Sequence, residues 1–257
     1  MNAQGAARGR LLLVPATLDL GGDPVPLQDV LPHGVLTVAA TLKHWRVENA
    51  RSARAFLKRV DGVVPLAHPL QTLDMAELPR PRKGAGDAVP PATWDALLAP
   101  AEVGHDIGLL SEAGLPAVAD PGAALVAAAH RQGLAVVPLP GASALVLALA
   151  ASGLEGQSFA FVGYLPQPAP ERAERLRALE ALSRRQGQTQ LWIETPYRNA
   201  AMVEAMVTAL SPSTRVTVSA GLTLGDARTF SATVAQWRKA PPVLTDRLPA
   251  VFGLLAC

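Results

Sequence analysis

The sequence is poor in the residues that staple small secreted proteins and bind metals. Its 257 residues include a single cysteine, Cys257, which excludes a disulfide framework and a cysteine-based metal site. The five histidines show no ligand spacing, so we expect them to be structural or on the surface and expect no bound metal. These absences predict a soluble protein of a reducing compartment, the cytoplasm.

Long hydrophobic runs and a strong charge bias are also missing. The longest apolar stretch, GASALVLALAASGL, is shorter than the roughly 20 residues that a bilayer-spanning helix needs. The opening MNAQGAARGR leads only into LLLVPA, which is too short for the apolar region of a signal peptide. The net charge of +2 permits an anionic partner without demanding one, so a nucleic-acid site has to come from local basic clusters.

What the first 150 residues do contain is an alternation of short apolar runs with helical patterns. The strand-like runs cover residues 10–16, 44–48, 62–68, 106–112 and 134–140. Continuous apolar strands that alternate with helices predict a mainly parallel sheet covered on both faces. Asn49 is placed to cap the helix that follows the second run.

The rhythm changes after Gly153. Strand-like runs now cover residues 158–166, 189–196, 215–221, 227–237 and 248–256, with helical patterns at 170–185 and 199–210. We predict two α/β domains, residues 1–153 with a mainly parallel sheet and 154–257 with a mixed sheet, the last two runs closing as an antiparallel hairpin. The segment 78–92 is rich in proline, glycine and basic residues, and we expect it to be a mobile loop.

Two loops of the first domain follow apolar strands and precede apolar helices. The first, SEAGLPAVADPG (111–122), contains Glu112 and Asp120, and the second, PGASA (140–144), contains Ser143. Loops at the carboxyl ends of parallel strands bind ligands in α/β proteins. Asp120 and Ser143 could instead be simple helix N-caps, and the residues alone leave both possibilities open. Neither loop carries a dinucleotide or ATP phosphate fingerprint.

These loops resemble those of a known family. GLLSEAGLPAVADPG and VVPLPGASA are similar to the SDAGTPLISDPG-type and VVPLPGP-type loops of the tetrapyrrole-methylase superfamily of S-adenosylmethionine-dependent methyltransferases. The nearest branch is the ribosomal RNA 2′-O-ribose methyltransferase I group, whose RFCFEGFLP, FYESPHR and AEDTRHTGLLL segments resemble SFAFVGYLP, IETPYRN and VENARSARAFL. PATLDLGGD, VENAR and SEAG depart from that group and resemble a short sister subgroup.

The resemblance implies a class III methyltransferase fold, with two α/β domains and S-adenosylmethionine in the cleft between them. It also implies a homodimer and an RNA or ribosomal-subunit partner. The residues that it implies for the cofactor lie in the two loops and at the ends of second-domain strands: Ser111, Glu112, Ala113, Gly114, Asp120, Gly141, Ala142, Ser143, Tyr164, Leu165, Thr195 and Tyr197.

An alcohol acceptor needs a general base within hydrogen-bond reach. The candidates are Glu48, Glu112, Asp120 and Glu194, and we predict Glu48 because VENAR opens at the edge of the sheet. Glu48 could alternatively pair with Arg51 or cap its helix. Phosphate contacts, which position RNA without reading its sequence, are predicted for Arg51, Arg54, Arg80, Arg82, Lys83 and Arg198.

Three functions therefore fit the sequence. The first is 2′-O-methylation of a ribose in ribosomal RNA. The second is methylation of a small molecule such as a tetrapyrrole, since a fold does not fix its substrate. The third is a non-catalytic protein that binds S-adenosylmethionine. Steep salt dependence of RNA binding would separate the first from the others.

Overall fold

The computed structural model describes residues 7–79, 89–120 and 122–256, and contacts within the chain divide it into two units. The first unit contains the segment that ends at Thr17 together with Val25–Ala142, and the second contains Leu18–Pro24 and the chain from Ser143 onward. The change of pattern at Gly153 predicts the boundary at residue 153 instead. The structure groups helix α6 (Ala144–Ser152) with the second unit because that helix packs against the second sheet.

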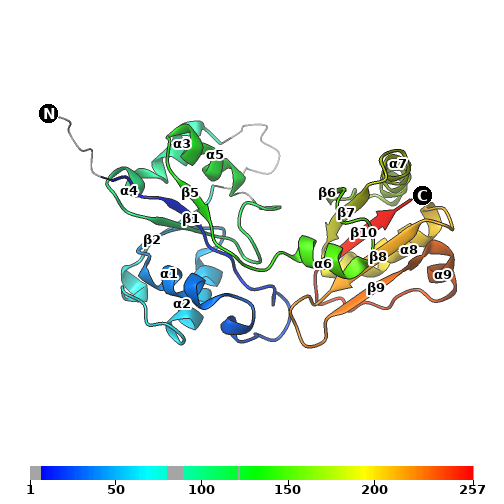
Figure 1. Ribbon diagram of the computed structural model, residues 1–257, viewed down its shortest axis with the longest axis horizontal. Helices are drawn as coiled ribbons and strands as arrows, with labels where there is room; N and C mark the ends of the chain where they lie inside the picture. Colours follow the sequence, from blue (N-terminus) through cyan, green and yellow to red (C-terminus); the bar gives the residue numbers. More distant parts are fainter. Residues whose placement is uncertain (1–6, 80–88, 121, 257) are drawn as a thin grey trace. The chain divides into compact units, whose positions relative to one another are not determined.

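A five-stranded parallel sheet forms the centre of the first unit, which confirms the predicted sheet type (Figure 1). β1 (Leu11–Leu13) lies between β4 (Ile107–Leu110) and β5 (Val136–Pro138), and its Leu12 is in register with Gly108 and Val137. In spatial order the strands are β3 (Asp74–Glu77), β2 (His44–Val47), β4 (Ile107–Leu110), β1 (Leu11–Leu13) and β5 (Val136–Pro138).

The strand predicted at 62–68 is wrong. The backbone turns after the preceding helix, where the amides of Val63 and Val64 both bond to the carbonyl of Val60. The apolar side chains of this turn pack against the core, so their pattern reports burial rather than an extended strand. The edge strand is β3 instead, whose sequence DMAE is too polar to be recognised as a buried strand.

Helices cover both faces of this sheet, as α/β architecture requires (Figure 1). Alternate side chains of one strand point to opposite faces. Leu12 therefore packs with α1 (His33–Thr41) and α2 (Ala50–Asp61), whereas Leu11 packs with α3 (Pro91–Ala96) and α5 (Ala123–Arg131). Gly108 allows the Trp45 ring to lie on the sheet, because a Cβ there would come within 2.7 Å of it. The helical segments are η1 (Leu27–Asp29), α1 (His33–Thr41), α2 (Ala50–Asp61), η2 (Leu70–Thr72), α3 (Pro91–Ala96), α4 (Ala99–Glu102) and α5 (Ala123–Arg131).

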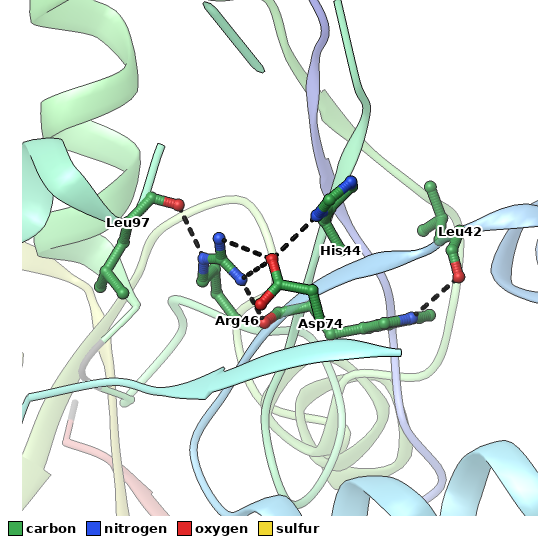
Figure 2. A network of polar contacts seen from close by, with 6 residues as sticks. Leu42, His44, Arg46, Asp74 and Leu97 are labelled. Carbon is green, nitrogen blue, oxygen red and sulfur yellow. Dashed lines mark hydrogen bonds and ion pairs between the residues drawn. The ribbon is translucent and has the colours of Figure 1, made fainter. Parts of the chain in front are cut away.

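A network of polar contacts ties the amino-terminal edge of the first sheet together (Figure 2). The Arg46 side chain, 5% exposed, donates to the carbonyls of Leu97 (2.7 Å) and Trp45 (2.9 Å) and lies 3.3 Å from the Asp74 carboxylate. His44 Nδ1 lies 2.8 Å from the same carboxylate. Burial raises the pKa of Asp74, but the hydrogen bond with His44 and the charge of Arg46 outweigh burial, and the pKa is lowered.

The second unit contains a mixed sheet, as predicted, with strands in the order β6 (Phe159–Tyr164), β7 (Thr189–Glu194), β10 (Ala250–Leu255), β8 (Arg215–Ala220) and β9 (Arg228–Thr233). β6 is parallel to β7, and the remaining neighbours are antiparallel. The expected hairpin between the last two runs is wrong, because β9 and β10 both pair with β8 from opposite sides.

Helices also cover the second sheet. Side chains of α7 (Ala169–Gln186), α8 (Asn199–Ala209) and α9 (Val234–Lys239) pack with Trp192, Val218 and Phe252 in one core. The end of the run at 227–237 is helix α9 rather than strand, because Thr233 forms a capping box with Gln236. On α6, the Ser152 carbonyl accepts a hydrogen bond of 2.6 Å from the Ser231 hydroxyl.

Candidate functional site

Two of the candidate bases, Glu48 and Glu112, meet at the carboxyl edge of the first sheet. β2 and β4 are parallel neighbours, and the amide of Glu48 continues their ladder by donating to the Leu110 carbonyl at 3.1 Å. The Glu48 carboxylate in turn accepts a hydrogen bond of 3.2 Å from the amide of Glu112. Glu48 therefore holds the start of the SEAG loop, and its carboxylate lies at the edge where α/β sheets bind ligands.

The SEAG loop is fixed by backbone contacts and contains strained residues. The amide of Ala16 donates to the Gly114 carbonyl at 2.8 Å, and the amide of Gly114 donates to the Thr17 carbonyl at 3.3 Å. Gly114, Ala117 and Ala119 all have a left-handed backbone, with φ of 68°, 67° and 66°. For an alanine this conformation costs about 1–2 kcal/mol, and such strain gathers at functional sites.

Asp120 completes a group of three carboxylates. Its pKa is raised to about 6, first by burial, then by the negative charges of Glu48 and Glu112, while a hydrogen bond with the Ser111 hydroxyl acts in the opposite direction. The alternative that Asp120 merely caps the next helix is wrong. Helix α5 has Gly122 at its N-cap and no side-chain cap.

The second loop lies close to the end of β1. A Cβ on Gly141 would come within 2.4 Å of the Pro15 ring, so only glycine allows this approach. Ser143 occupies the N-cap position of α6, but its side chain makes no capping hydrogen bond. Gly141 and Ala142 belong to the first unit, and Ser143 to the second.

Helix α2 (Ala50–Asp61) begins two residues after Glu48. The Asn49 side chain accepts hydrogen bonds from the amides of Arg51 (2.9 Å) and Ser52 (3.3 Å), which confirms the predicted cap. Glu48 is therefore not the cap. Within the described ranges the Arg51 and Arg54 side chains are exposed and form no hydrogen bond or ion pair, so the pairing of Glu48 with Arg51 is also wrong.

The second unit brings its own predicted residues to one edge. β6 and β7 are parallel, so Tyr164 and Leu165 at the end of one strand lie beside Thr195 and Tyr197 after the other. Leu165 is buried, whereas Tyr164 and Tyr197 are 59% and 74% exposed. A bulge at Gly163, whose φ is 74°, shifts the register where β6 reaches this edge.

Glu194 and Arg198 form an ion pair in the second unit. The Glu194 side chain is fully buried, lies 3.1 Å from Arg198 Nη2 and accepts hydrogen bonds from the amide and hydroxyl of Thr195. A carboxylate held in this way fixes the Thr195 loop rather than accepting a substrate proton. Arg198 is 15% exposed and also donates to the Pro166 carbonyl. Three of the predicted phosphate contacts, Arg80, Arg82 and Lys83, lie outside the described residues.

Some contributors were not foreseen from the sequence. The Thr17 carbonyl that holds Gly114 is a backbone group and leaves no pattern in the residue types. The left-handed alanines Ala117 and Ala119 are likewise invisible, since alanine does not signal positive φ. Among the described residues, no group of three or more His, Cys, Asp or Glu side chains is arranged to hold a metal ion. No helix in those residues is both long and apolar enough to cross a bilayer.

The two α/β units and the loops at their strand ends define a class of protein. A model of the Tetrapyrrole (Corrin/Porphyrin) Methylases family matches residues 47–237, and the chain belongs to this family.

Named relatives each match part of the chain. Ribosomal RNA small subunit methyltransferase I of Mesorhizobium japonicum is 40% identical over 139 residues, which are 54% of this chain and 44% of the relative. The protein of the same name from Halalkalibacterium halodurans is 45% identical over 95 residues, 37% of this chain and 32% of the relative. The chain thus matches less than half the length of these curated relatives.

Solved structures share the fold across nearly the whole chain. A conserved hypothetical protein of Aeropyrum pernix K1 has a TM-score of 0.61 at 18% identity, covering 97% of this chain and 85% of that one. The methyltransferase CobJ has a TM-score of 0.55 at 18% identity, covering 97% and 95%. At such low identity these likenesses establish the fold alone, and they support the predicted two-domain architecture.

Proposed function

We propose that the protein is an S-adenosylmethionine-dependent methyltransferase that methylates the 2′-hydroxyl of a ribose in ribosomal RNA. The observation that carries this proposal is the cluster of three acidic residues, Glu48, Glu112 and Asp120, at the carboxyl edge of the first sheet. The chain that contains them belongs to the methylase family. The names of the curated relatives favour ribosomal RNA as the acceptor.

The chemistry of this edge suits the cofactor. S-adenosylmethionine supplies a methyl group activated by a sulfonium cation, and it also carries an ammonium group and ribose hydroxyls. Carboxylates attract cations and accept hydrogen bonds from hydroxyls. We assign cofactor contacts to Glu112 and Asp120, together with the backbone of 111–114 and 141–143. Tyr164, Leu165, Thr195 and Tyr197 at the edge of the second sheet complete the proposed set.

Glu48 is the proposed general base. A 2′-hydroxyl loses its proton as its oxygen accepts the methyl group, and a carboxylate within hydrogen-bond reach can take that proton. Glu48 follows β2 directly, and its amide is held by Leu110. The contact with the Glu112 amide fixes the position of this carboxylate at the edge of the sheet.

We assign the substrate contacts to basic residues. Arg51 and Arg54 are exposed and suited to phosphate, and Arg80, Arg82 and Lys83 keep the role predicted from the sequence. The Arg198 guanidinium forms an ion pair with Glu194, so we assign it the role of positioning the Thr195 loop rather than of contacting phosphate. We further propose a homodimer, since two-fold dimers are the commonest oligomers, and action on the ribosomal subunit in the cytoplasm.

Two measurements test the proposal. Calorimetric titration with S-adenosylmethionine and S-adenosylhomocysteine should show saturable binding of both. Tritium from labelled cofactor should then appear in small ribosomal subunits that lack the modification, and nuclease digestion should recover it as a 2′-O-methylated nucleoside.

Other outcomes would select the other functions. The family description favours a tetrapyrrole as the second candidate acceptor. Transfer to uroporphyrinogen and not to RNA would replace the proposal by that activity. Cofactor binding without transfer to RNA or tetrapyrrole would favour a non-catalytic binding protein, and absence of cofactor binding would refute the methyltransferase assignment.

A further inference from the structure

One face of α2 carries three basic side chains in a row. Arg51, Arg54 and Lys58 are spaced three and four residues apart, which places them on one side of a helix. All three are exposed, and none forms a hydrogen bond or ion pair with any described residue. The next basic residue, Arg59, differs in that it donates to the Val25 carbonyl at 2.7 Å. We call the set Arg51, Arg54 and Lys58 the α2 stripe.

The helix itself is firmly placed, so the stripe has a fixed geometry. The opposite face of α2 is buried in the core of the first unit through Ala53, Phe56, Leu57 and Val60. Its first amides are all occupied, two by Asn49 and that of Ala50 by the Glu77 carboxylate at 2.8 Å. The end of the helix is therefore not an anion site, and any anion has to bind along the side chains.

Helix stability does not explain the basic residues at the start of α2. A cation in the first turn faces the positive end of the helix dipole, which is unfavourable by a few tenths of a kilocalorie unless an anion compensates. Arg51 lies in this turn and Arg54 just after it. The Glu77 carboxylate on the Ala50 amide offsets the dipole, but neither arginine side chain has an ion-pair partner among the described residues. Lys58 alone, in the last turn, is where the dipole favours a cation.

The surroundings leave the positive charge of the stripe in place. Helix α1, which packs beside α2, has the sequence HGVLTVAAT and contributes no acidic side chain. Asp61, at the far end of α2, accepts a hydrogen bond from the Leu66 amide at 2.9 Å. The carboxylates of Glu48, Glu112 and Asp120 lie beyond the other end of the helix, at the proposed methylation site.

We propose that the α2 stripe is a track for the phosphate backbone of the RNA substrate, running along α2 from the acidic edge. Lys58 thereby becomes a substrate contact, and the row spans about 10 Å along the helix axis, enough for two or three successive phosphates. The repulsion between phosphates and the Glu48 edge would keep the backbone on the helix while a ribose reaches the edge. This inference rests on the proposed RNA acceptor.

The test is RNA binding as a function of salt. The probe is a fluorescein-labelled, single-stranded RNA of about 20 nucleotides of mixed sequence, titrated by anisotropy between about 50 and 200 mM KCl. In the variant R51Q/R54Q/K58Q the slope of log K against log salt should fall by about 2, and affinity near 0.1 M salt should fall roughly a hundredfold. The charge-conserving variant R51K/R54K/K58R should keep the slope of the unaltered protein.

A charge-matched control separates the stripe from net charge. R175Q/R177Q/R185Q removes three exposed basic groups from α7, and it should leave the slope unchanged. An unchanged slope in the stripe variant, or an equal loss in the α7 control, would overturn the proposal. So would loss of binding to phosphatidylserine vesicles with RNA binding intact, which would indicate a membrane contact instead.

Cofactor calorimetry on the same proteins keeps this inference distinct from the proposed function. The stripe variant should bind S-adenosylmethionine as the unaltered protein does. If neither protein binds the cofactor, the methyltransferase proposal fails while the slope difference still decides the stripe. If both bind it and their RNA slopes agree, only the stripe fails.

Discussion

Replacing Asp120 by asparagine should make the protein more stable at neutral pH, although the change removes a charge from its surface. The pKa of Asp120 is raised to about 6 from 3.8, because burial and the charges of Glu48 and Glu112 disfavour the ionised form. Between about pH 4 and 6, Asp120 is protonated in the folded protein and ionised in the unfolded chain. The contribution of Asp120 to the free energy of unfolding is therefore greatest below pH 4, and it is lost as the pH rises through 6.

The size of the effect follows from the shift. A change from 3.8 to about 6 corresponds to about 3 kcal/mol at most, and partial exposure of the carboxyl group reduces this to about 1–2 kcal/mol through solvent screening. Asp120→Asn carries no ionisable group and avoids this loss. Its free energy of unfolding should exceed that of the unaltered protein by about 1–2 kcal/mol at pH 7.5, and the two should agree near pH 4.

Urea unfolding at several pH values measures the difference, and a carboxyl ¹³C NMR titration measures the pKa directly. Glu48→Gln and Glu112→Gln should each lower the midpoint of Asp120, because each removes a repelling charge. Ser111→Ala should raise it, since the lost hydrogen bond favours the ionised form. Asp106→Asn is the matched control. Its pKa is lowered by the hydrogen bond from Arg10, so that variant should lose stability at neutral pH.

A midpoint near 4 for Asp120, or one that ignores Glu48→Gln, would refute this reasoning. Either result would mean that the three carboxyl groups do not interact at the sheet edge. Equal stability of Asp120→Asn and the unaltered protein at pH 7.5 would point the same way.

Three further variants test other parts of the molecule. Glu48→Gln should slow methyl transfer by about 10²–10⁴-fold with unchanged calorimetric affinity for S-adenosylhomocysteine, which lacks the sulfonium charge, and a normal rate would remove Glu48 as the base. Gly114→Val forces a branched residue into a left-handed backbone at a cost of about 1–2 kcal/mol, so cofactor affinity should be lost while circular dichroism stays native. Asp74→Asn leaves the buried Arg46 guanidinium without its counter-charge, and urea unfolding at neutral pH should show a loss of about 1–2 kcal/mol. The lowered pKa of Asp74 stabilises the protein above the unfolded value of 3.8, so this difference should vanish at lower pH.

The elements that the sequence predicts well are those in which burial and local propensity agree. β4 is apolar throughout and buried at every position, and α2 has both an N-cap and a buried face. The failures occur where the two conflict. GVVPLAH is apolar because it packs on the core as a turn, and β3 is polar because it lies at the edge of the sheet. Periodicity alone does not separate these cases.

The candidate site divides in the same way. Glu48, Glu112 and Asp120 are visible in the sequence as acidic residues at strand ends, and the parallel order of β2 and β4 brings the first two together. Their mutual effect on pKa depends on burial and distance, which residue types do not report. Arg198 shows the opposite limit. Its position suggested phosphate binding, but the fold pairs it with a buried carboxylate four residues away.

The two ends of the first sheet differ in how their charges are arranged. At the amino edge each aspartate faces a cation, Asp74 with Arg46 and Asp106 with Arg10, and both pKa values are lowered. At the carboxyl edge Asp120 faces two like charges, and its pKa is raised. Each of these aspartates at the amino edge is thus paired with a cation, whereas both charges that shift the pKa of Asp120 at the carboxyl edge are negative.

A bound sulfonium cation would bring a positive charge to the carboxyl edge and lower the pKa of Asp120, so binding should release a proton below about pH 6. By linkage, affinity for S-adenosylmethionine should increase between about pH 5 and 7. S-adenosylhomocysteine, which lacks the sulfonium charge, should gain less over the same range. Calorimetry of both ligands at about pH 5.5 and 7.5 makes the comparison. If the two affinities change in parallel with pH, the carboxylates at this edge do not interact with the sulfonium. The raised pKa of Asp120 is then unrelated to binding of the cofactor.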